Sequence, residues 1–524
     1  MSWSLSERER ADTAARVAAN IATLAFFRGT ELSDDAAAAA AAAIERKAYT
    51  AAIVAARTTT GNRPAGEIAS GYARKLAELA LEAVKSGGAA LEPAAPAAVA
   101  GAEEHDLTGS RDFLDADAAE KALAPLLAAG SVIKKVRFST KSFGREAAHV
   151  AARALRSVAH CLEHADMSDV IAGRAEDEAL EALRTMSAAL STSKLRHLNL
   201  SDNALGEKGV RAAADAFVGQ EGLEFLSLQN VGASVHACKA LGELMVHTRA
   251  LAGLHLFNNM SGDEGAGHIG ALLARCPAMA NFKMASSRVG PEGGIALAKG
   301  LSTSHCLVRL DLSDNPLTEE VAPALAALLA SQPVLRALNL NDTSLTDTGV
   351  AQVCKALAGA APQLEELELA LNEITPDGAR AVAAAVSGKV HLFKLNLREN
   401  ELESAGASTV ARALSSLPAL TQLDLAANQI SRAGALAVAR ALVSGGRRAF
   451  ERLVLDENYL ADDAVDAVSD TLAGAFGGAG CLSAEDLDPD AAEDEDEDEE
   501  GGDEAMDDGA ADELAAALEK GARI

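Results

Sequence analysis

Apolar residues recur with one regular spacing through the middle of the chain. From residue 195 onward the pattern LxxLxLxxNxL, in which x is any residue, aligns ten times with varying completeness. Successive copies begin at residues 195, 223, 251, 279, 307, 335, 364, 392, 420 and 450. Every step is 28 residues except one of 29 and one of 30. Such regularity predicts a repeated structural unit in which each copy folds alike.

Each copy divides into a strand, a bend and a helix. Leucines three and then two positions apart predict one short strand with its apolar side inward and alternate residues outward. The asparagine falls where the strand ends, and we expect its buried amide to bond backbone groups of the bend and of the next coil. These asparagines are Asn203, Asn259, Asn315, Asn372, Asn400, Asn428 and Asn458. Helical segments such as 209–217 and 378–386 follow, with Thr375 as an N-cap and Pro376 in the first turn.

These features are the signature of a leucine-rich repeat. A 28-residue unit with a full helix predicts an α/β solenoid, a ribonuclease-inhibitor-like horseshoe with strands on its concave face and helices on its convex face. A degenerate unit at 136–155 precedes the ten copies, and 162–174 occupies the next position. A glycine fourteen residues after the start of most copies predicts close approach of the helix to its neighbours. These glycines are Gly209, Gly265, Gly293, Gly349, Gly378, Gly406 and Gly434.

The two ends of the chain differ from its centre. Residues 1–87 predict a small all-α domain, and the Ala/Pro/Gly-rich stretch 88–107 predicts a flexible linker to a repeat domain at 108–484. The expected helices of the first domain span 7–27, 34–57 and 71–87. Residues 485–524 form an acidic tail with eighteen Asp or Glu and no Lys or Arg between 485 and 513. We expect this tail to be disordered, because it cannot bury enough apolar surface to offset chain entropy.

Composition narrows the possible partners. The 524 residues carry a formal net charge of −29, which argues against nucleic acid or an anionic membrane as partner and favours a basic protein surface. Six scattered cysteines without a CxxC pair fit reduced, buried thiols of an intracellular protein. The sequence has no signal peptide and no uncharged apolar run of 18 residues, so we expect a soluble protein of the cytosol or nucleus.

Common catalytic and metal-binding motifs are missing from the sequence. It contains no GxxxxGK[ST] phosphate loop, no HExxH, no GxSxG and no His/Cys cluster with zinc spacing. His197 and His255 occupy outward strand positions, and we expect them to be solvated concave-face residues rather than ligands. The repeat therefore favours protein binding over self-contained hydrolysis or metal catalysis.

One arginine lies in an unusual setting. The stretch "MSDVIAGRAEDEA", residues 167–179, places Arg174 among Asp169, Glu176, Asp177 and Glu178. A lone arginine among acids is usually a local ion pair worth about 0 to 1 kcal/mol. The residues alone leave open whether Arg174 is such a pair or a functional side chain.

A second residue departs from the repeat pattern. The asparagines at the strand ends of successive copies are here called the ladder. In "LSLQNVG" Val231 holds the ladder position, and Asn230 comes one residue earlier. Asn230 is therefore less suited than its counterparts to the structural amide role. This displacement favours a functional role for Asn230.

The order of modules resembles that of the plant-type GTPase-activating proteins for the small GTPase Ran (RanGAP), across nearly the whole chain. The strings that carry the resemblance are "RFSTKSFGREAA" (137–148), "SDVIAGR" (168–174), "KLRHLNLSDNALGEKGVRA" (194–212), "HLFNNMSGDEGA" (255–266) and "RVGPEGGIALA" (288–298). One departure concerns the N-terminal module, which in the family carries a Trp-Pro-Pro motif implicated in docking at the nuclear envelope. Here Trp3 is followed by Ser4 and Leu5.

The resemblance implies roles for particular residues. Arg174 matches the family's functional "GR" arginine, and Asn230 matches its functional asparagine in a following repeat. We also expect partner binding through Asp169, Glu176, Asp202, Asn258 and Trp3. Replacing Arg174 or Asn230 is expected to lower activity rather than stability, since neither occupies a leucine or ladder position.

The resemblance also implies a function. The chain would bind Ran in its GTP form and accelerate hydrolysis without inserting an arginine finger, by arranging the GTPase's own glutamine and attacking water. It would hold no cofactor or metal of its own, because GTP and Mg²⁺ belong to the partner. Further expected contacts are a Ran-binding protein and a docking partner at the outer face of the nuclear envelope, with no direct membrane insertion. The alternative is a non-catalytic repeat scaffold or inhibitor.

Overall fold

The computed structural model divides into two units, residues 1–100 and residues 101–524. It describes residues 103–485 except 446, 448, 477 and 478, and in the first unit positions 13, 17, 41, 44, 48, 72 and 74–76. Those isolated positions are all helical and fall inside the three expected helices. The remainder of those helices, Trp3, residues 88–102 and the tail beyond 485 lie outside the described residues.

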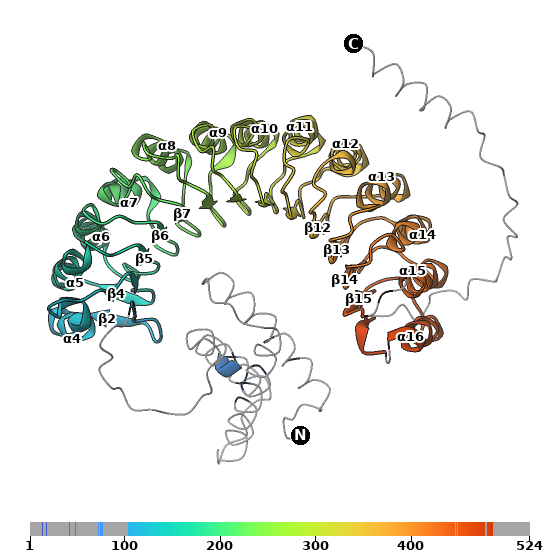
Figure 1. Ribbon diagram of the computed structural model, residues 1–524, viewed down its shortest axis with the longest axis horizontal. Helices are drawn as coiled ribbons and strands as arrows, with labels where there is room; N and C mark the ends of the chain where they lie inside the picture. Colours follow the sequence, from blue (N-terminus) through green and yellow to red (C-terminus); the bar gives the residue numbers. More distant parts are fainter. Residues whose placement is uncertain are drawn as a thin grey trace, which may run out of the picture. The chain divides into compact units, whose positions relative to one another are not determined.

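The second unit is built on one long parallel sheet. Its strands are β1 (Glu104–Asp106), β3 (Lys135–Arg137), β5 (His164–Asp166), β6 (His197–Asn199), β7 (Phe225–Ser227), β8 (Gly253–His255), β9 (Asn281–Lys283), β10 (Arg309–Asp311), β11 (Ala337–Asn339), β12 (Glu366–Glu368), β13 (Lys394–Asn396), β14 (Gln422–Asp424), β15 (Arg452–Val454) and β16 (Leu482–Ser483). They pair in chain order, and β2 (Asp112–Leu114) pairs separately with β4 (Lys141–Phe143). The described repeats curve, with these strands on the inner side (Figure 1).

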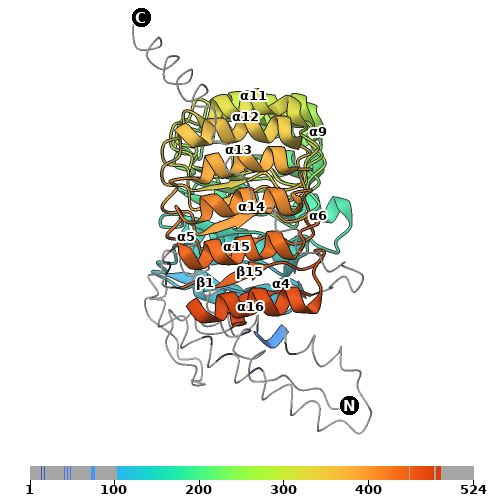
Figure 2. The ribbon, with the colours of Figure 1, turned by 90° about the vertical axis from the view of Figure 1, so that its right-hand side faces the viewer.

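Helices cover the outer side of the sheet. They are α4 (Ala116–Leu127), α5 (Arg145–Val158), α6 (Glu176–Leu190), α7 (Gly206–Ala212), α8 (Val235–Leu244), α9 (Gly262–Leu273), α10 (Pro291–Leu301), α11 (Ala322–Leu329), α12 (Thr346–Gly359), α13 (Pro376–Val386), α14 (Glu403–Leu414), α15 (Arg432–Ser444) and α16 (Asp462–Phe476). Short 3₁₀ turns occupy η1 (Ala214–Ala216), η2 (Glu319–Val321) and η3 (Ala479–Cys481). Successive helices lie side by side in one layer (Figures 1 and 2).

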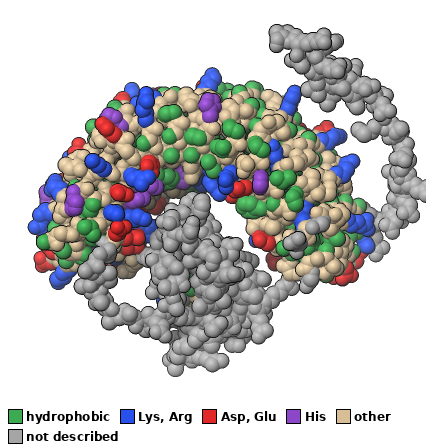
Figure 3. Space-filling view, in the orientation of Figure 1, with side chains coloured by type: hydrophobic (Ala, Val, Ile, Leu, Met, Phe, Trp, Pro, Cys, Tyr) green, Lys and Arg blue, Asp and Glu red, His purple; other side chains and the backbone are tan. Residues whose placement is uncertain are grey.

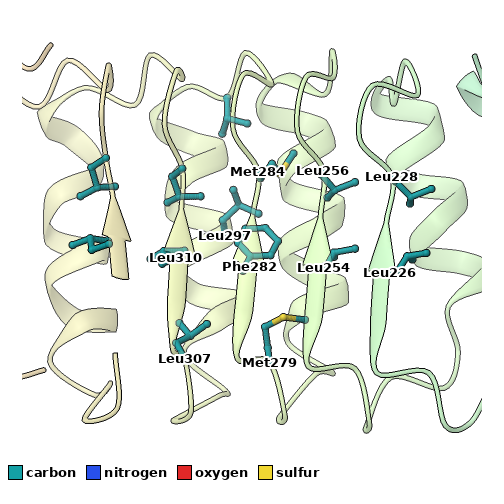
Figure 4. Packing of buried hydrophobic residues seen from close by; sticks show 14 of the residues in the cluster. Leu226, Leu228, Leu254, Leu256, Met279, Phe282, Met284, Leu297, Leu307 and Leu310 are labelled. Carbon is teal, nitrogen blue, oxygen red and sulfur yellow. The ribbon is translucent and has the colours of Figure 1, made fainter. Parts of the chain in front are cut away.

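Strand register follows the leucine pattern. Leu198, Leu226 and Leu254 lie opposite one another on adjacent strands and are fully buried. In the least regular copy, Met279, Phe282 and Met284 take leucine positions and are also fully buried. The side chains of Leu226, Leu254 and Phe282 point from the strands toward the helices (Figure 4). The predicted α/β leucine-rich-repeat solenoid is confirmed.

The buried asparagines link each coil to its neighbour. The Asn315 carbonyl accepts from the backbone N–H of Ser287 and Val289 in the preceding coil at 3.1 and 2.9 Å. Its amide donates to the carbonyls of Met284 and Leu312 at 2.8 and 2.9 Å. Asn203, Asn259, Asn400 and Asn458 bond the coils in the same way. The predicted ladder is therefore confirmed.

The predicted capping and glycine roles are also confirmed at α13. The Thr375 side chain accepts a hydrogen bond from the N–H of Asp377, and Pro376 begins the helix. A Cβ at Gly378 would collide with the side chains of Ile374 and Asp347. The glycine thus lets α13 approach the preceding coil.

Two expectations about boundaries are corrected. β1 pairs with β3 in register, so the sheet begins at Glu104, inside the stretch expected to be linker. The sequence of β1, EHD, lacks the leucine that marks most of the other strands of the sheet. β1 is recognised as a strand only because it pairs with β3. The helix expected over 209–217 is instead α7 followed by η1, because the chain leaves helical geometry at Ala213 (φ −85°, ψ 7°).

Replacing Asn315 should weaken the stack locally. Asn315→Ala would leave the buried N–H groups of Ser287 and Val289 and the carbonyl of Met284 without this partner, which should cost about 1 to 3 kcal/mol. Hydrogen exchange should accelerate at Ser287 and Val289, and the melting temperature should fall. Asp314→Asn, an exposed change one residue away, is the control. Unchanged exchange in Asn315→Ala would contradict the ladder.

Candidate functional site

A row of polar residues follows the edge where the chain leaves the strands, here called the strand-exit edge. It comprises Asp169, Asp202, Asn230, Asn258, Ser286 and Asp314, one from each successive repeat. All have φ between 50° and 60°, a left-handed conformation that Asp and Asn tolerate better than most residues. In each repeat the residue of this row comes one position before the ladder position. The side chains of Asp202, Asn230 and Asn258 are exposed.

Asn230 belongs to this row and not to the ladder. Val231 is buried at the ladder position, and its N–H donates to the Asn259 carbonyl at 3.2 Å. The Asn230 backbone N–H donates to the Phe257 carbonyl at 2.8 Å. Its side-chain amide donates to Asp202 Oδ1 and accepts from Asn258 Nδ2, both at 3.1 Å. The displacement found in the sequence therefore places the Asn230 side chain in solvent.

Three of the expected site residues thus lie together. Asp202, Asn230 and Asn258 form one hydrogen-bonded row across three repeats. The exposed side chains of Phe257 and Met260 flank the last of them. An open groove of about 470 Å³ begins at Asn230 and continues along the edge; it is lined by Asn230, Gly232, Asn258, Asn259, Met260, Ser286, Arg288, Asp314 and Pro316.

Arg174 is held by the fold at the N-terminal end of the same edge. Its Nε donates to Ser142 Oγ at 3.0 Å, and its Nη2 donates to the carbonyls of Ser142 and Leu114 at 2.8 and 3.3 Å. The guanidinium lies over the Phe113 ring, 5.1 Å from its centroid, and the side chain is 17% exposed. These contacts tie the loop before α6 to β2 and β4. Arg174 is a clamp between coils.

Two of the four acids around Arg174 pair with other residues. Glu178 is the one of the four carboxylates that contacts it within the described residues, at 3.4 Å. Asp169 is buried and accepts from Arg111, while exposed Glu176 pairs with Lys208. The expectation that replacing Arg174 would spare stability is not supported by these contacts, because its removal would break the hydrogen bonds that link this loop to Ser142 and Leu114.

Arg111 and Phe113 are residues that sequence reasoning missed. Phe113 is 59% exposed although aromatic, and it covers both Arg174 and Gly173. Both residues lie about 60 positions before their partners, Phe113 in β2 and Arg111 directly before it, outside the leucine pattern. No local signal marks such contacts.

Histidines form a stacked row on the concave face. The rings of His164 and His197 stack with centroids 4.2 Å apart, and Phe225 lies between His197 and His255. Burial lowers the pKa of His164 to about 4, aided by the nearby His197, and burial also lowers the pKa values of His197 and His255. The expected concave location of His197 and His255 is confirmed, but the expectation that they are solvated is wrong, because both rings are half-buried and pack on neighbouring rings. Histidine and charged side chains line part of the inner rim (Figure 3).

No group of three or more His, Cys, Asp or Glu among the described residues could hold a metal ion. None of the helices described is long and apolar enough to cross a membrane.

The stacked histidines should make stability depend on pH. Unfolded His164 titrates near 6.5 but the native residue near 4, so between these values the unfolded chain binds the extra proton. Stability should therefore fall as the pH is lowered from about 6.5 to about 4. His164→Phe, which keeps a ring on His197, should reduce this acid loss in melting temperature. The exposed loop change His305→Asn should not, and equal acid sensitivity in all three proteins would contradict the assignment.

The fold and the asparagine ladder define a leucine-rich-repeat protein. Family models for this repeat also match parts of the sequence. Models described as Leucine Rich repeat match residues 193–212 and 361–383, and a Leucine Rich Repeat model matches 306–328. Among curated proteins, the chain is similar to RAN GTPase-activating protein 1 of Arabidopsis thaliana, with 42% identity over 175 residues that make up 32% of each chain. It is 46% identical to RAN GTPase-activating protein 2 of the same plant over 147 residues, 27% of each chain.

The matched stretches span between a quarter and a third of the length of these curated relatives. Among solved structures, an internalin from Listeria monocytogenes superposes with a TM-score of 0.38 and 13% identity, over 68% of this chain and 80% of that one.

Proposed function

We propose that this protein is a Ran GTPase-activating protein, which binds Ran in its GTP form and accelerates GTP hydrolysis. The observation that carries the proposal is the similarity of 42% and 46% to two plant proteins of that name. The strand-exit edge supports it, because Asn230, which the family resemblance singles out, is exposed on a groove able to receive a partner. In this proposal GTP and Mg²⁺ are carried by the GTPase, and the chain supplies no self-contained catalytic centre.

Arg174 and Asn230 would contribute differently. The Arg174 guanidinium is engaged by Ser142, Leu114 and Phe113, so it is poorly placed to enter a partner's active site as an arginine finger. It would act by holding the N-terminal coils in the shape that the GTPase contacts. Asn230 projects a neutral donor and acceptor from a rigid turn, which suits it to orient polar groups of the partner.

Further proposals concern partners and location. Docking through the N-terminal module would place the protein in the cytoplasm at the outer face of the nuclear envelope, where a Ran-binding protein could join the complex. Trp3 and the acidic tail would contribute contacts outside the described residues. The alternative of an inhibitory repeat scaffold also fits the fold, and a hydrolysis assay separates the two.

Hydrolysis kinetics test the function and its residues. The chain should accelerate single-turnover GTP hydrolysis by Ran, whereas a scaffold would leave the rate unchanged. Asn230→Gly, which suits the left-handed turn, should lower the stimulated rate at least about tenfold, or about 1.4 kcal/mol of transition-state stabilisation, at unchanged melting temperature.

Arg174→Ala should lower both the rate and the melting temperature, and Arg174→Lys should restore part of each. Full stimulation by Asn230→Gly and Arg174→Ala would remove both residues from the site.

The first unit should be dispensable for activation. Because residues 1–100 cluster as a separate unit, a chain of residues 101–524 should stimulate Ran within about twofold of the full chain. Far-ultraviolet circular dichroism should verify that the truncated protein is folded. A large loss of stimulation in a folded truncation would contradict this division of roles.

A further inference from the structure

The Asn230 amide lies between two different neighbours. On one side Asp202 presents a carboxylate oxygen 3.1 Å from Asn230 Nδ2. On the other side Asn258 presents its Nδ2 3.1 Å from Asn230 Oδ1. A carboxylate only accepts hydrogen bonds, so the NH₂ end of Asn230 must face Asp202. Its carbonyl end then faces the one neighbour able to donate.

The backbone makes this arrangement rigid. All three residues are held in the left-handed turn, with φ of 60°, 52° and 55°. The N–H of each donates to the following coil, to the carbonyls of Gln229, Phe257 and Ala285. With the backbone fixed, the Asn230 side chain can still rotate about its two side-chain bonds, and the hydrogen bonds to Asp202 and Asn258 restrict this rotation.

We propose that Asp202 and Asn258 are positioning residues that hold the Asn230 amide in a single orientation for the partner GTPase. This inference rests on the proposed function. Within the described residues one N–H and one carbonyl lone pair of Asn230 stay available. The partner therefore meets a donor on the Asp202 side and an acceptor on the Asn258 side. A partner group that accepts on the first side and donates on the second is the complementary chemistry.

Exchanging the two neighbours tests the orientation. The double variant Asp202→Asn/Asn258→Asp keeps the net charge and both hydrogen bonds but places the carboxylate on the other side, so the Asn230 amide should turn by about 180°. With full-length protein, the maximal stimulated rate of single-turnover hydrolysis by Ran should fall at least about tenfold, close to that of Asn230→Gly. The melting temperature should not change, and the concentration for half-maximal stimulation should stay within about threefold.

Single changes complete the test. Asp202→Asn alone leaves the amide free to take either orientation, so it should lower the maximal rate at least about twofold. Asp342→Asn, which makes the same change at the equivalent left-handed position further along the edge (φ 52°), should leave it unchanged. If the double variant misfolds, the contrast between these two single variants decides.

The outcomes separate this inference from the function on which it rests. A wild-type chain without any stimulation overturns the proposed function and this inference with it. Stimulation by the wild type together with an equally active double variant, or equal rates in Asp202→Asn and wild type, overturns the positioning role alone.

Discussion

The bond between a buried asparagine and the neighbouring coil is the interaction on which the rest of the repeat unit depends. A parallel strand of three residues makes few hydrogen bonds to its neighbouring strands, and the chain must then bend sharply toward its helix. The amide of Asn315 and its equivalents bonds the backbone of both coils at this bend, so each coil is fixed to the next. At the same bend the preceding residue takes the left-handed conformation, also where no ladder asparagine follows it, as at Asn230. The side chains of Asp202, Asn230 and Asn258 are exposed there, so the bend places them beside the ladder.

That row explains why a structural repeat can carry a site. Side chains fixed by a regular backbone recur about every 28 residues and face the same way. A substitution at one of these positions therefore changes one surface side chain without disturbing the core. Val231 shows this well. Its buried N–H still reaches the Asn259 amide, although its own repeat lacks the ladder asparagine. The fold tolerates that loss, and Asn230 remains free to engage Asp202 and Asn258.

The N-terminal coils are held differently. Their leucine pattern is weak, and ionic and aromatic contacts replace part of it. Arg174 bonds Ser142 and Leu114 and covers Phe113, while Arg111 pairs with buried Asp169. Charged and aromatic side chains thus bridge the first coils of the described repeats. In the proposed function, a change at Arg174 would therefore lower both activity and stability, whereas a change at Asn230 would lower activity alone.

The sequence by itself determined the repeat, its strands and helices, the asparagine ladder and the displaced position of Asn230. All of these follow from spacing, because each coil obeys the same local rules of alternation, capping and turn formation. Tertiary structure decided what spacing does not encode. β1 became a strand only by pairing with β3, and Arg174 became a clamp through residues about 30 and 60 positions earlier. The direction of the Asn230 amide likewise depends on neighbours 28 residues away on either side, which only the stacking of coils brings within hydrogen-bond distance.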